Sequence, residues 1–243
     1  AFYDSRQLHH EISTELRLHG QWQGELDSLR KNGDAFTAMV TLTVRRDAQR
    51  RSTHVIGMVT DVTYRKATEQ RLHHQTLHDA LTGLPNRLLL GQRLQQTVAN
   101  TGRGGRGVAL LFIDLNRFRD INDNFDHSAG DTVLIDMAQR LRNCLRESDL
   151  LARLAGDEFA VLLDDTDAEG ATRVASKLLD RVAQPFVVYG HELVLTASIG
   201  IALYPTDGLE AEALVRCADT ALHRAKQDGP GHCAFFAAGM QQR

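Results

Sequence analysis

The chain has 243 residues, of which 42% are hydrophobic and 24% charged, and its formal net charge at pH 7 is −3. This is the composition of one or two ordinary globular domains, and it excludes a disordered or collagen-like chain. The near-neutral charge argues against a dedicated nucleic-acid-binding protein. The longest apolar run, residues 108–113, is far shorter than the roughly 20 residues of a transmembrane helix, so no membrane segment is predicted.

The three cysteines, Cys144, Cys217 and Cys233, are widely spaced and form no CxxC pair. This spacing indicates neither a disulfide framework nor a zinc site, and reduced thiols are typical of a cytoplasmic protein. The sequence begins at Ala1 with no signal-peptide pattern, as expected of a segment cut from a longer protein.

Residues 1–63 predict a small segment with one helix and three strands. The helix covers residues 11–18, and the strands cover 22–29, 36–44 and 55–62, with a Lys-Asn-Gly-Asp turn before the second strand. So few elements make a marginal core. The strings at 20–26, 30–34 and 57–63 resemble the C-terminal half of a PAS sensor domain, whose opening helix and first two strands are missing.

Residues 64–78 are polar, rich in Arg, His and Gln, and free of Gly and Pro. They predict a solvent-exposed connecting helix. Its apolar positions are too sparse for a self-sufficient coiled coil, although pairing with a partner copy in a homodimer stays open.

From residue 79 onward the pattern predicts an α/β domain. A buried strand over 108–113 precedes a helix over 132–145 and a hairpin of strands 150–154 and 159–163. A helix over 168–182, a second hairpin over 186–189 and 192–203, and a helix over 211–227 follow. This order indicates helices packed on a mixed sheet.

Three carboxylates are candidates for metal binding. Asp114 follows the buried strand, where ligand sites gather in open α/β sheets, although a helix cap would also explain a lone Asp. Asp157 and Glu158 lie at a hairpin tip, where Asp suits a turn but Glu gains nothing. If that hairpin pairs beside the Asp114 strand, the carboxylates converge and suit a hard divalent cation such as Mg²⁺.

A short helix after Asp114 would place Arg119 and Asn122 on one face, three residues apart. Asn offers both a hydrogen-bond donor and an acceptor, and Asp131 adds acceptors. Together these groups suit the edge of guanine, whereas each one alone is more typical of a solvated surface.

Several motifs in one order resemble the GGDEF family of diguanylate cyclases over residues 77–237. They are Asp-Ala-Leu-Thr-Gly-Leu-Pro-Asn-Arg at 79–87, Phe-Ile-Asp-Leu-Asn-Arg-Phe at 112–118, Ile-Asn-Asp at 121–123, His127, Gly130-Asp131, Arg-Leu-Ala-Gly-Asp-Glu-Phe at 153–159, Ala-Asp-Thr-Ala-Leu at 218–222 and Ala225-Lys226. The resemblance implies an α+β fold like the palm of polymerases and nucleotidyl cyclases. It also implies that a homodimer joins two GTP molecules into cyclic di-GMP and releases two pyrophosphates.

The resemblance implies roles for the carboxylates. Asp114, Asp157 and the Leu115 carbonyl would hold Mg²⁺ or Mn²⁺. Glu158 would be a further metal ligand or would assist deprotonation of the ribose 3′-hydroxyl.

Substrate contacts follow from the same resemblance. Asn122 and Asp131 would read guanine, Arg119 and Lys226 would contact the phosphates, and Gly156 would lie against the substrate. Separately, the Arg-Glu-Ser-Asp string at 146–149 matches the family's RxxD inhibitory site. Arg146 and Asp149 would bind the product there, although a charged helix end would also explain Arg146.

The chain departs from the family pattern at three positions. Ala155 replaces the first Gly of the signature, Asp126 stands where Gly is usual, and Pro230 replaces an Arg that contacts phosphate. These changes favour weaker GTP binding and leave the carboxylates intact. The alternative is therefore a weak or inactive module that binds GTP or cyclic di-GMP and regulates a linked EAL phosphodiesterase domain.

The expected organisation has four parts. Residues 1–63 form the partial PAS segment, 64–78 the connecting helix and 79–237 the GGDEF domain. Residues 238–243 begin a linker, because the string at 235–240 looks like the exit of a GGDEF domain into an EAL domain.

Overall fold

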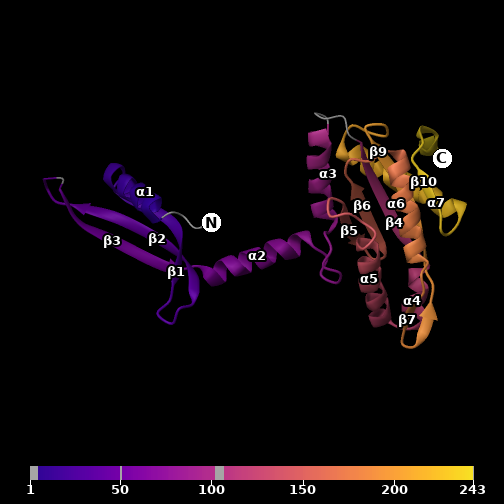
Figure 1. Ribbon diagram of the computed structural model, residues 1–243, viewed down its shortest axis with the longest axis horizontal. Helices are drawn as coiled ribbons and strands as arrows, with labels where there is room; N and C mark the ends of the chain where they lie inside the picture. Colours follow the sequence, from indigo (N-terminus) through magenta and orange to yellow (C-terminus); the bar gives the residue numbers. More distant parts are fainter. Residues whose placement is uncertain (1–4, 50, 102–106, 243) are drawn as a thin grey trace. The chain divides into compact units, whose positions relative to one another are not determined.

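The computed structural model describes residues 5–49, 51–101 and 107–242. The chain divides into two units, Ala1–His73 and His74–Arg243, each with its own internal packing (Figure 1). Within the described residues, no helix combines the length and apolarity needed to cross a bilayer.

The first unit is a three-stranded antiparallel sheet with one helix on it. Strands β1 (Gln21–Leu29), β2 (Ala35–Arg46) and β3 (Ser52–Asp61) lie in the order β1-β2-β3. Helix α1 (Ser5–Leu18) packs its apolar side on the sheet, and the small buried core consists of Trp22, Ala38 and Val40. The helix and the three strands are present in the predicted order, but α1 begins at Ser5, six residues before the predicted start. Every residue of β3 is exposed.

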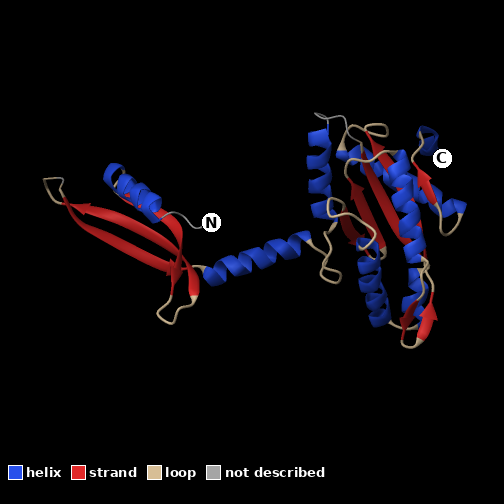
Figure 2. Cartoon of the chain, in the orientation of Figure 1, coloured by secondary structure: helices blue, strands red, loops and turns tan. Residues whose placement is uncertain are grey.

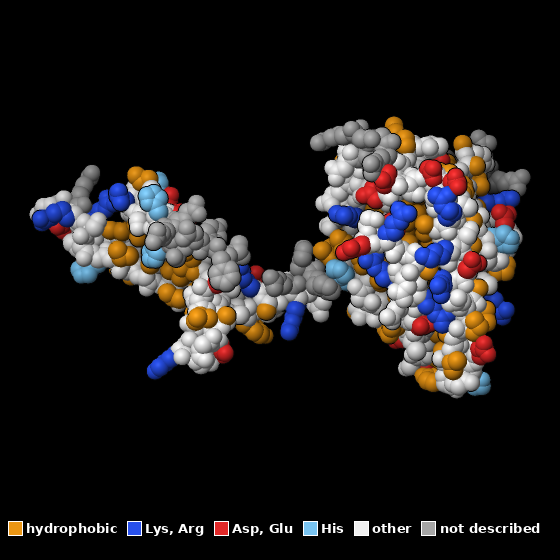
Figure 3. All heavy atoms as spheres, viewed as in Figure 1, with side chains coloured by type: hydrophobic (Ala, Val, Ile, Leu, Met, Phe, Trp, Pro, Cys, Tyr) orange, Lys and Arg blue, Asp and Glu red, His pale blue; other side chains and the backbone are white. Residues whose placement is uncertain are grey.

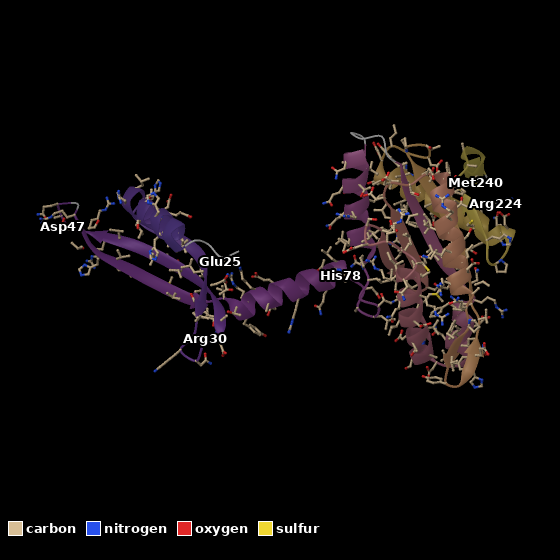
Figure 4. All side chains as sticks on the ribbon, viewed as in Figure 1. Glu25, Arg30, Asp47, His78, Arg224 and Met240 are labelled. Atoms are coloured by element: carbon tan, nitrogen blue, oxygen red, sulfur yellow. The ribbon has the colours of Figure 1, made fainter. Side chains whose placement is uncertain are left out.

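One ion pair lies at the end of this sheet, and a second joins the sheet to the helix that follows. Arg30 pairs with Asp61, and Glu25 pairs with Lys66 in helix α2 (Thr63–Leu77). Figure 4 labels Glu25 on β1 and Arg30 at the turn after it. Helix α2 matches the helix predicted over residues 64–78 to within one residue at each end.

The second unit is built on a five-stranded sheet in the order β10-β9-β4-β6-β5. Its strands are β4 (Val108–Asn116), β5 (Leu150–Ala155), β6 (Glu158–Leu163), β9 (Thr196–Tyr204) and β10 (Cys233–Phe235). Strand β4 pairs antiparallel with both β6 and β9, whereas β10 runs parallel to β9, so the sheet is mixed. The predicted fold class, a mixed sheet flanked by helices, is confirmed (Figure 2).

Helices cover both faces of the sheet. The helices are α3 (Arg87–Thr101), α4 (Phe118–Asn124), α5 (His127–Arg142), α6 (Ala168–Val182) and α7 (Ala211–Asp228). Alternate residues of β4 face opposite sides of the sheet and belong to two separate parts of the core. Leu111 and Ile113 pack with α4, α5 and α6, whereas Leu110 and Phe112 pack with α3 and α7. A strand buried on both faces reads as a continuous apolar run, which is the pattern in the sequence.

The structure corrects several predicted elements. The hairpin predicted over 186–203 is a small two-stranded sheet of β7 (Phe186–Val188) and β8 (His191–Leu193), and β9 is a separate strand of the central sheet. The run from 192 to 203 contains no proline and no typical turn dipeptide, so no breaker marks the end of β8 at residues 194–195. The sequence analysis also missed α3, β10 and the short helix η1 (Ala238–Gln242).

Candidate active site

The register of the central sheet places two of the three predicted carboxylates side by side. Asp114 on β4 lies directly opposite Glu158, the first residue of β6. Strand β4 extends to Asn116, so Asp114 lies inside the strand and is not a helix cap. Because neighbouring Phe112 and Ala160 pack toward α3 and α7, alternation puts both carboxylates on that face.

Asp157 occupies the turn between β5 and β6 and is tied to the same strand. Its backbone carbonyl accepts a hydrogen bond from the Leu115 N–H at 3.3 Å. Burial raises the pKa of the Asp157 carboxyl, and the nearby charge of Asp114 adds to this rise, so the two acids lie within electrostatic reach. The pairing of β4 with β6 that the sequence predicts is present and sets Asp114 opposite Glu158. Within the described residues, however, the three carboxylates do not form a group that could hold a metal by themselves.

Three cationic side chains surround these acids. Lys226 on α7 places its Nζ 2.6 Å from Asp114 Oδ2. Arg87, at the start of α3, lies 3.7 Å from Glu158 Oε2, and the charge of Arg119 on α4 offsets a small part of the rise in the Asp157 pKa. Beside Glu158 is a cavity of about 260 Å³, which Arg87 also lines. A site of this charge pattern suits a phosphate-rich ligand.

A buried arginine holds the turn that carries Asp157. The Arg153 guanidinium donates to the Gly156 carbonyl at 3.0 and 2.8 Å and to Asp79 Oδ1 at 2.8 Å. Gly156 has a φ of +51°, which glycine adopts without strain. Ala155 is exposed and is not among the described residues with positive φ, so the turn accommodates its methyl group.

The predicted guanine-reading residues meet where α4 and α5 join. The Asn122 side chain packs on Gly130, since a Cβ built there would lie 2.0 Å from Asn122 Oδ1. Asp131 follows Gly130 directly on α5 and is exposed. We call the segment from Asn122 to Asp131 the α4–α5 corner. It carries one amide side chain and one carboxylate, which together offer hydrogen-bond donors and acceptors.

Comparison with known proteins agrees with this geometry. The family described as "Diguanylate cyclase, GGDEF domain" matches residues 76–232. The chain belongs to the GGDEF family.

Its relatives carry several named activities. The chain is 44% identical over 164 residues to the bifunctional diguanylate cyclase/cyclic di-GMP phosphodiesterase MucR of Pseudomonas aeruginosa, covering 68% of this chain and 24% of MucR. It is 44% identical to the diguanylate cyclase TpbB of the same species, with 66% and 37% covered. It is 40% identical to NbdA, named a cyclic di-GMP phosphodiesterase, with 71% and 22% covered. The chain thus spans about a quarter of MucR and NbdA.

Among solved structures, the GGDEF domain of PA1120 (TpbB or YfiN) from P. aeruginosa is 40% identical, with a TM-score of 0.66 over 68% of this chain and 97% of that one. DgcB from Caulobacter crescentus, solved in complex with c-di-GMP, gives a TM-score of 0.66 at 21% identity over 72% of this chain and 93% of that one. The second similarity bears on the GGDEF fold only.

The GGDEF site has the hard oxygen donors that Mg²⁺ prefers. Asp114 and Asp157 supply carboxylates, and the Leu115 carbonyl lies between them in sequence. Within the described part of the chain, no group of three His, Cys, Asp or Glu side chains comes close enough to hold a metal alone. A cation bound here would need carbonyl oxygen, water or substrate phosphate to complete its coordination.

The Asp157→Asn variant is expected to be more thermostable than the wild type at pH 7 without a divalent cation. Burial and, secondarily, the Asp114 charge raise the pKa of the Asp157 carboxyl. The folded state therefore binds this proton more tightly than the unfolded state, and ionisation costs stability as pH rises through the folded pKa. The melting temperature should rise by about 2–4 °C per kcal/mol relieved.

That gain should vanish below about pH 4, where Asp157 is protonated in both states. Added Mg²⁺ should stabilise the wild type more than the variant. The matched control is Asp180→Asn, on the exposed surface of α6. A variant that melts at or below the wild-type temperature at pH 7 would contradict the electrostatic account.

The predicted inhibitory pair lies away from these carboxylates, after α5. Asp149 is buried, and its Oδ2 accepts the Arg146 backbone N–H at 2.9 Å, which closes the turn. Arg146 lines an open cavity of about 610 Å³ together with Arg173 and Lys177. Figure 3 shows Lys and Arg side chains spread over the face of the second unit that α5 and α6 cover.

The sequence analysis gave no role to Arg87, Arg153 or Asp79, although Asp79 and Arg87 stand in one quoted motif and Arg153 opens another. Asp79 also accepts the Thr82 N–H and hydroxyl, at 2.8 and 2.7 Å. Asp79 therefore shapes the turn before α3 and also holds the Arg153 side chain. The charged residues inside these two motifs were the only sign in the sequence that Asp79, Arg87 and Arg153 have a role.

Proposed function

We propose that this GGDEF domain is a Mg²⁺-dependent diguanylate cyclase that condenses two GTP molecules into cyclic di-GMP and two pyrophosphates. The observation that carries the proposal is the cross-strand pair of Asp114 and Glu158, flanked by Lys226 and Arg87. Two carboxylates directly opposite each other are unfavourable in a purely structural module, because like charges in that position destabilise a sheet.

The chain's own residues would divide the chemistry as follows. Glu158 takes the proton of a ribose 3′-hydroxyl, and the freed oxygen bonds to the α-phosphorus of the second GTP. The bond from that phosphorus to the pyrophosphate oxygen breaks. Lys226 and Arg119 balance charge on the phosphates, which is the electrostatic positioning typical of phosphoryl transfer. Asp114, Asp157 and the Leu115 carbonyl would hold Mg²⁺, which supplies further charge neutralisation at the phosphates.

Substrate recognition would rest on the α4–α5 corner. Asn122 and Asp131 would hydrogen-bond the guanine edge, and the Gly156 turn lets the nucleotide approach the backbone. Each domain would bind one GTP, so that cyclisation needs two copies in a homodimer. Product bound near Arg146 and Asp149 would inhibit the enzyme. The first unit would be the C-terminal half of a PAS sensor in a parent protein that also carries an EAL domain.

A regulatory role is the second candidate. The loop at Pro230 lacks the arginine expected there, which removes a charge-assisted bond worth about 1.5–3 kcal/mol. In that case the domain binds GTP or cyclic di-GMP without turnover and tunes a linked phosphodiesterase. The phosphodiesterase name of NbdA is compatible with this role.

The deciding experiment is a product assay. Purified protein is incubated with GTP and Mg²⁺, and cyclic di-GMP and pyrophosphate are quantified by chromatography. The proposal expects both products, in a ratio of one to two, with none after chelation of the metal and none from ATP. Binding of GTP without product, both here and in a protein that carries the whole sensor region, would favour the regulatory role.

A further inference from the structure

The tip of the β7–β8 hairpin has an unfavourable residue. Tyr189 and Gly190 connect the two strands, with φ angles of +50° and +82°. A two-residue turn with both φ values positive prefers Asn, Asp or Gly, and a bulky side chain there is strained. Tyr189 is 63% exposed, so burial of its ring does not offset the strain. Strain of this kind persists where another interaction requires the residue.

Two contacts join this tip to the α4–α5 corner. The Tyr189 hydroxyl donates to Asp126 Oδ1 at 3.3 Å. Beside it, the rings of Phe125 and His191 lie 5.5 Å apart and tilted by 57°. One polar contact and one aromatic contact therefore fasten the hairpin to two consecutive residues of the corner.

The residue that receives Tyr189 also begins helix α5. Asp126 is the N-cap of α5, and its Oδ1 accepts the Ala129 N–H at 2.7 Å. Gly130, the next residue, is the surface on which the Asn122 side chain packs, and Asp131 follows it. The contacts thus run from Tyr189 through Asp126 and the first turn of α5 to the proposed guanine-reading pair. Asp126, a departure from the family pattern, is here a helix cap and the acceptor for Tyr189.

We propose that Tyr189 is a positioning residue that fixes the α4–α5 corner for guanine recognition. It touches no nucleotide itself and acts through Asp126. This inference rests on the proposed function, because it assumes that Asn122 and Asp131 bind guanine.

Two substitutions separate positioning from a purely structural role. Tyr189→Phe keeps the ring and removes the hydroxyl, whereas Tyr189→Asn also relieves the strain, since Asn tolerates positive φ. A structural role predicts that Tyr189→Asn melts at the same or a higher temperature and binds GTP normally. A positioning role predicts a weaker affinity for GTP in both variants, by about two- to tenfold, with no loss of melting temperature in Tyr189→Asn.

Binding is measured by titrating GTP with Mg²⁺ into proteins that also carry Glu158→Gln, so that turnover does not interfere. The preference for GTP over ATP should fall in the Tyr189 variants, because the corner reads the base. Val187→Thr is the matched control, since Val187 lies in the same hairpin and is exposed. In the active protein, the variants should raise KM for GTP and leave kcat nearly unchanged.

The outcomes distinguish the two proposals. Variants that bind GTP as tightly as their parent, with the same preference over ATP, would overturn the role of Tyr189. Failure of both this parent and the wild type to bind GTP would overturn it too, because no guanine site would exist. Weakened GTP binding in the variants, with no cyclic di-GMP made by the wild type, would support the role of Tyr189 and refute the cyclase proposal.

Discussion

Cyclic di-GMP synthesis should fall by at least about 10²–10⁴-fold in Glu158→Gln, the usual contribution of a general base. Gln keeps the size and hydrogen-bonding capacity of Glu but cannot take a proton. It also keeps a contact for Arg87, which lies 3.7 Å away. Removing one of two facing negative charges relieves repulsion with Asp114. The variant should therefore fold at least as stably as the wild type and still bind GTP.

The matched control is Glu192→Gln, an exposed glutamate on β8. It should retain wild-type synthesis. Synthesis by Glu158→Gln within tenfold of the wild type would exclude Glu158 as the base. Loss of GTP binding in Glu158→Gln would instead indicate a role in holding the substrate. Initial rates and calorimetric titration on the same protein samples separate these results.

Arg153→Ala should lower the free energy of unfolding of the second unit by about 3 kcal/mol. Arg153 and Asp79 form an ion pair whose side chains are 10% and 24% exposed. Removing one partner leaves a largely buried charge unpaired, which typically costs about 3–5 kcal/mol, and the partial exposure of Asp79 lowers that figure. The Gly156 carbonyl would also lose two hydrogen bonds.

The control is Arg173→Ala, which breaks an exposed pair with Glu169 on α6 and should cost less than about 1 kcal/mol. Urea unfolding must be followed by far-ultraviolet circular dichroism. The single tryptophan, Trp22, lies in the first unit and does not report on the second. Equal losses for the two variants would show that Arg153 is no more important than a surface arginine.

An Asp79→Asn, Arg153→Ala double variant, compared with the two single variants, would measure the coupling between the two residues. Because they touch, the two single effects should not add. A coupling energy near zero would mean that Arg153 stabilises the turn through Gly156 alone.

Local patterns predicted most of the second unit, since periodicity is a property of neighbouring residues. The apolar run at 108–113 identified the central strand, and the spacing at 168–182 gave both ends of α6. The helix predicted from residue 132 begins earlier, at His127, because Asp126 caps it. Helix α3 was not predicted, because the apolar run Leu88 to Leu90 obscures the four-residue spacing of Leu90, Leu94 and Val98.

The site was less predictable than the fold. The sequence indicated which acids matter, but strand register decided that Asp114 faces Glu158, and register is set by the packing of the whole sheet. Lys226 reaches Asp114 from 112 residues away along the chain. No pattern of neighbouring residues in the sequence predicts such a contact. The link from Tyr189 to Asp126 was invisible for the same reason.

Strand β4 is the central strand of five and has a hydrogen-bonded neighbour on each side, so Asp114 stands on a well-supported element of the sheet. The proposed base-reading residues instead lie on a seven-residue helix and at a corner. Mutations at the corner therefore leave the strands that carry the proposed metal-binding acids in place. In such an arrangement, the choice of nucleobase is free to change over evolutionary time while the bond-forming chemistry is preserved.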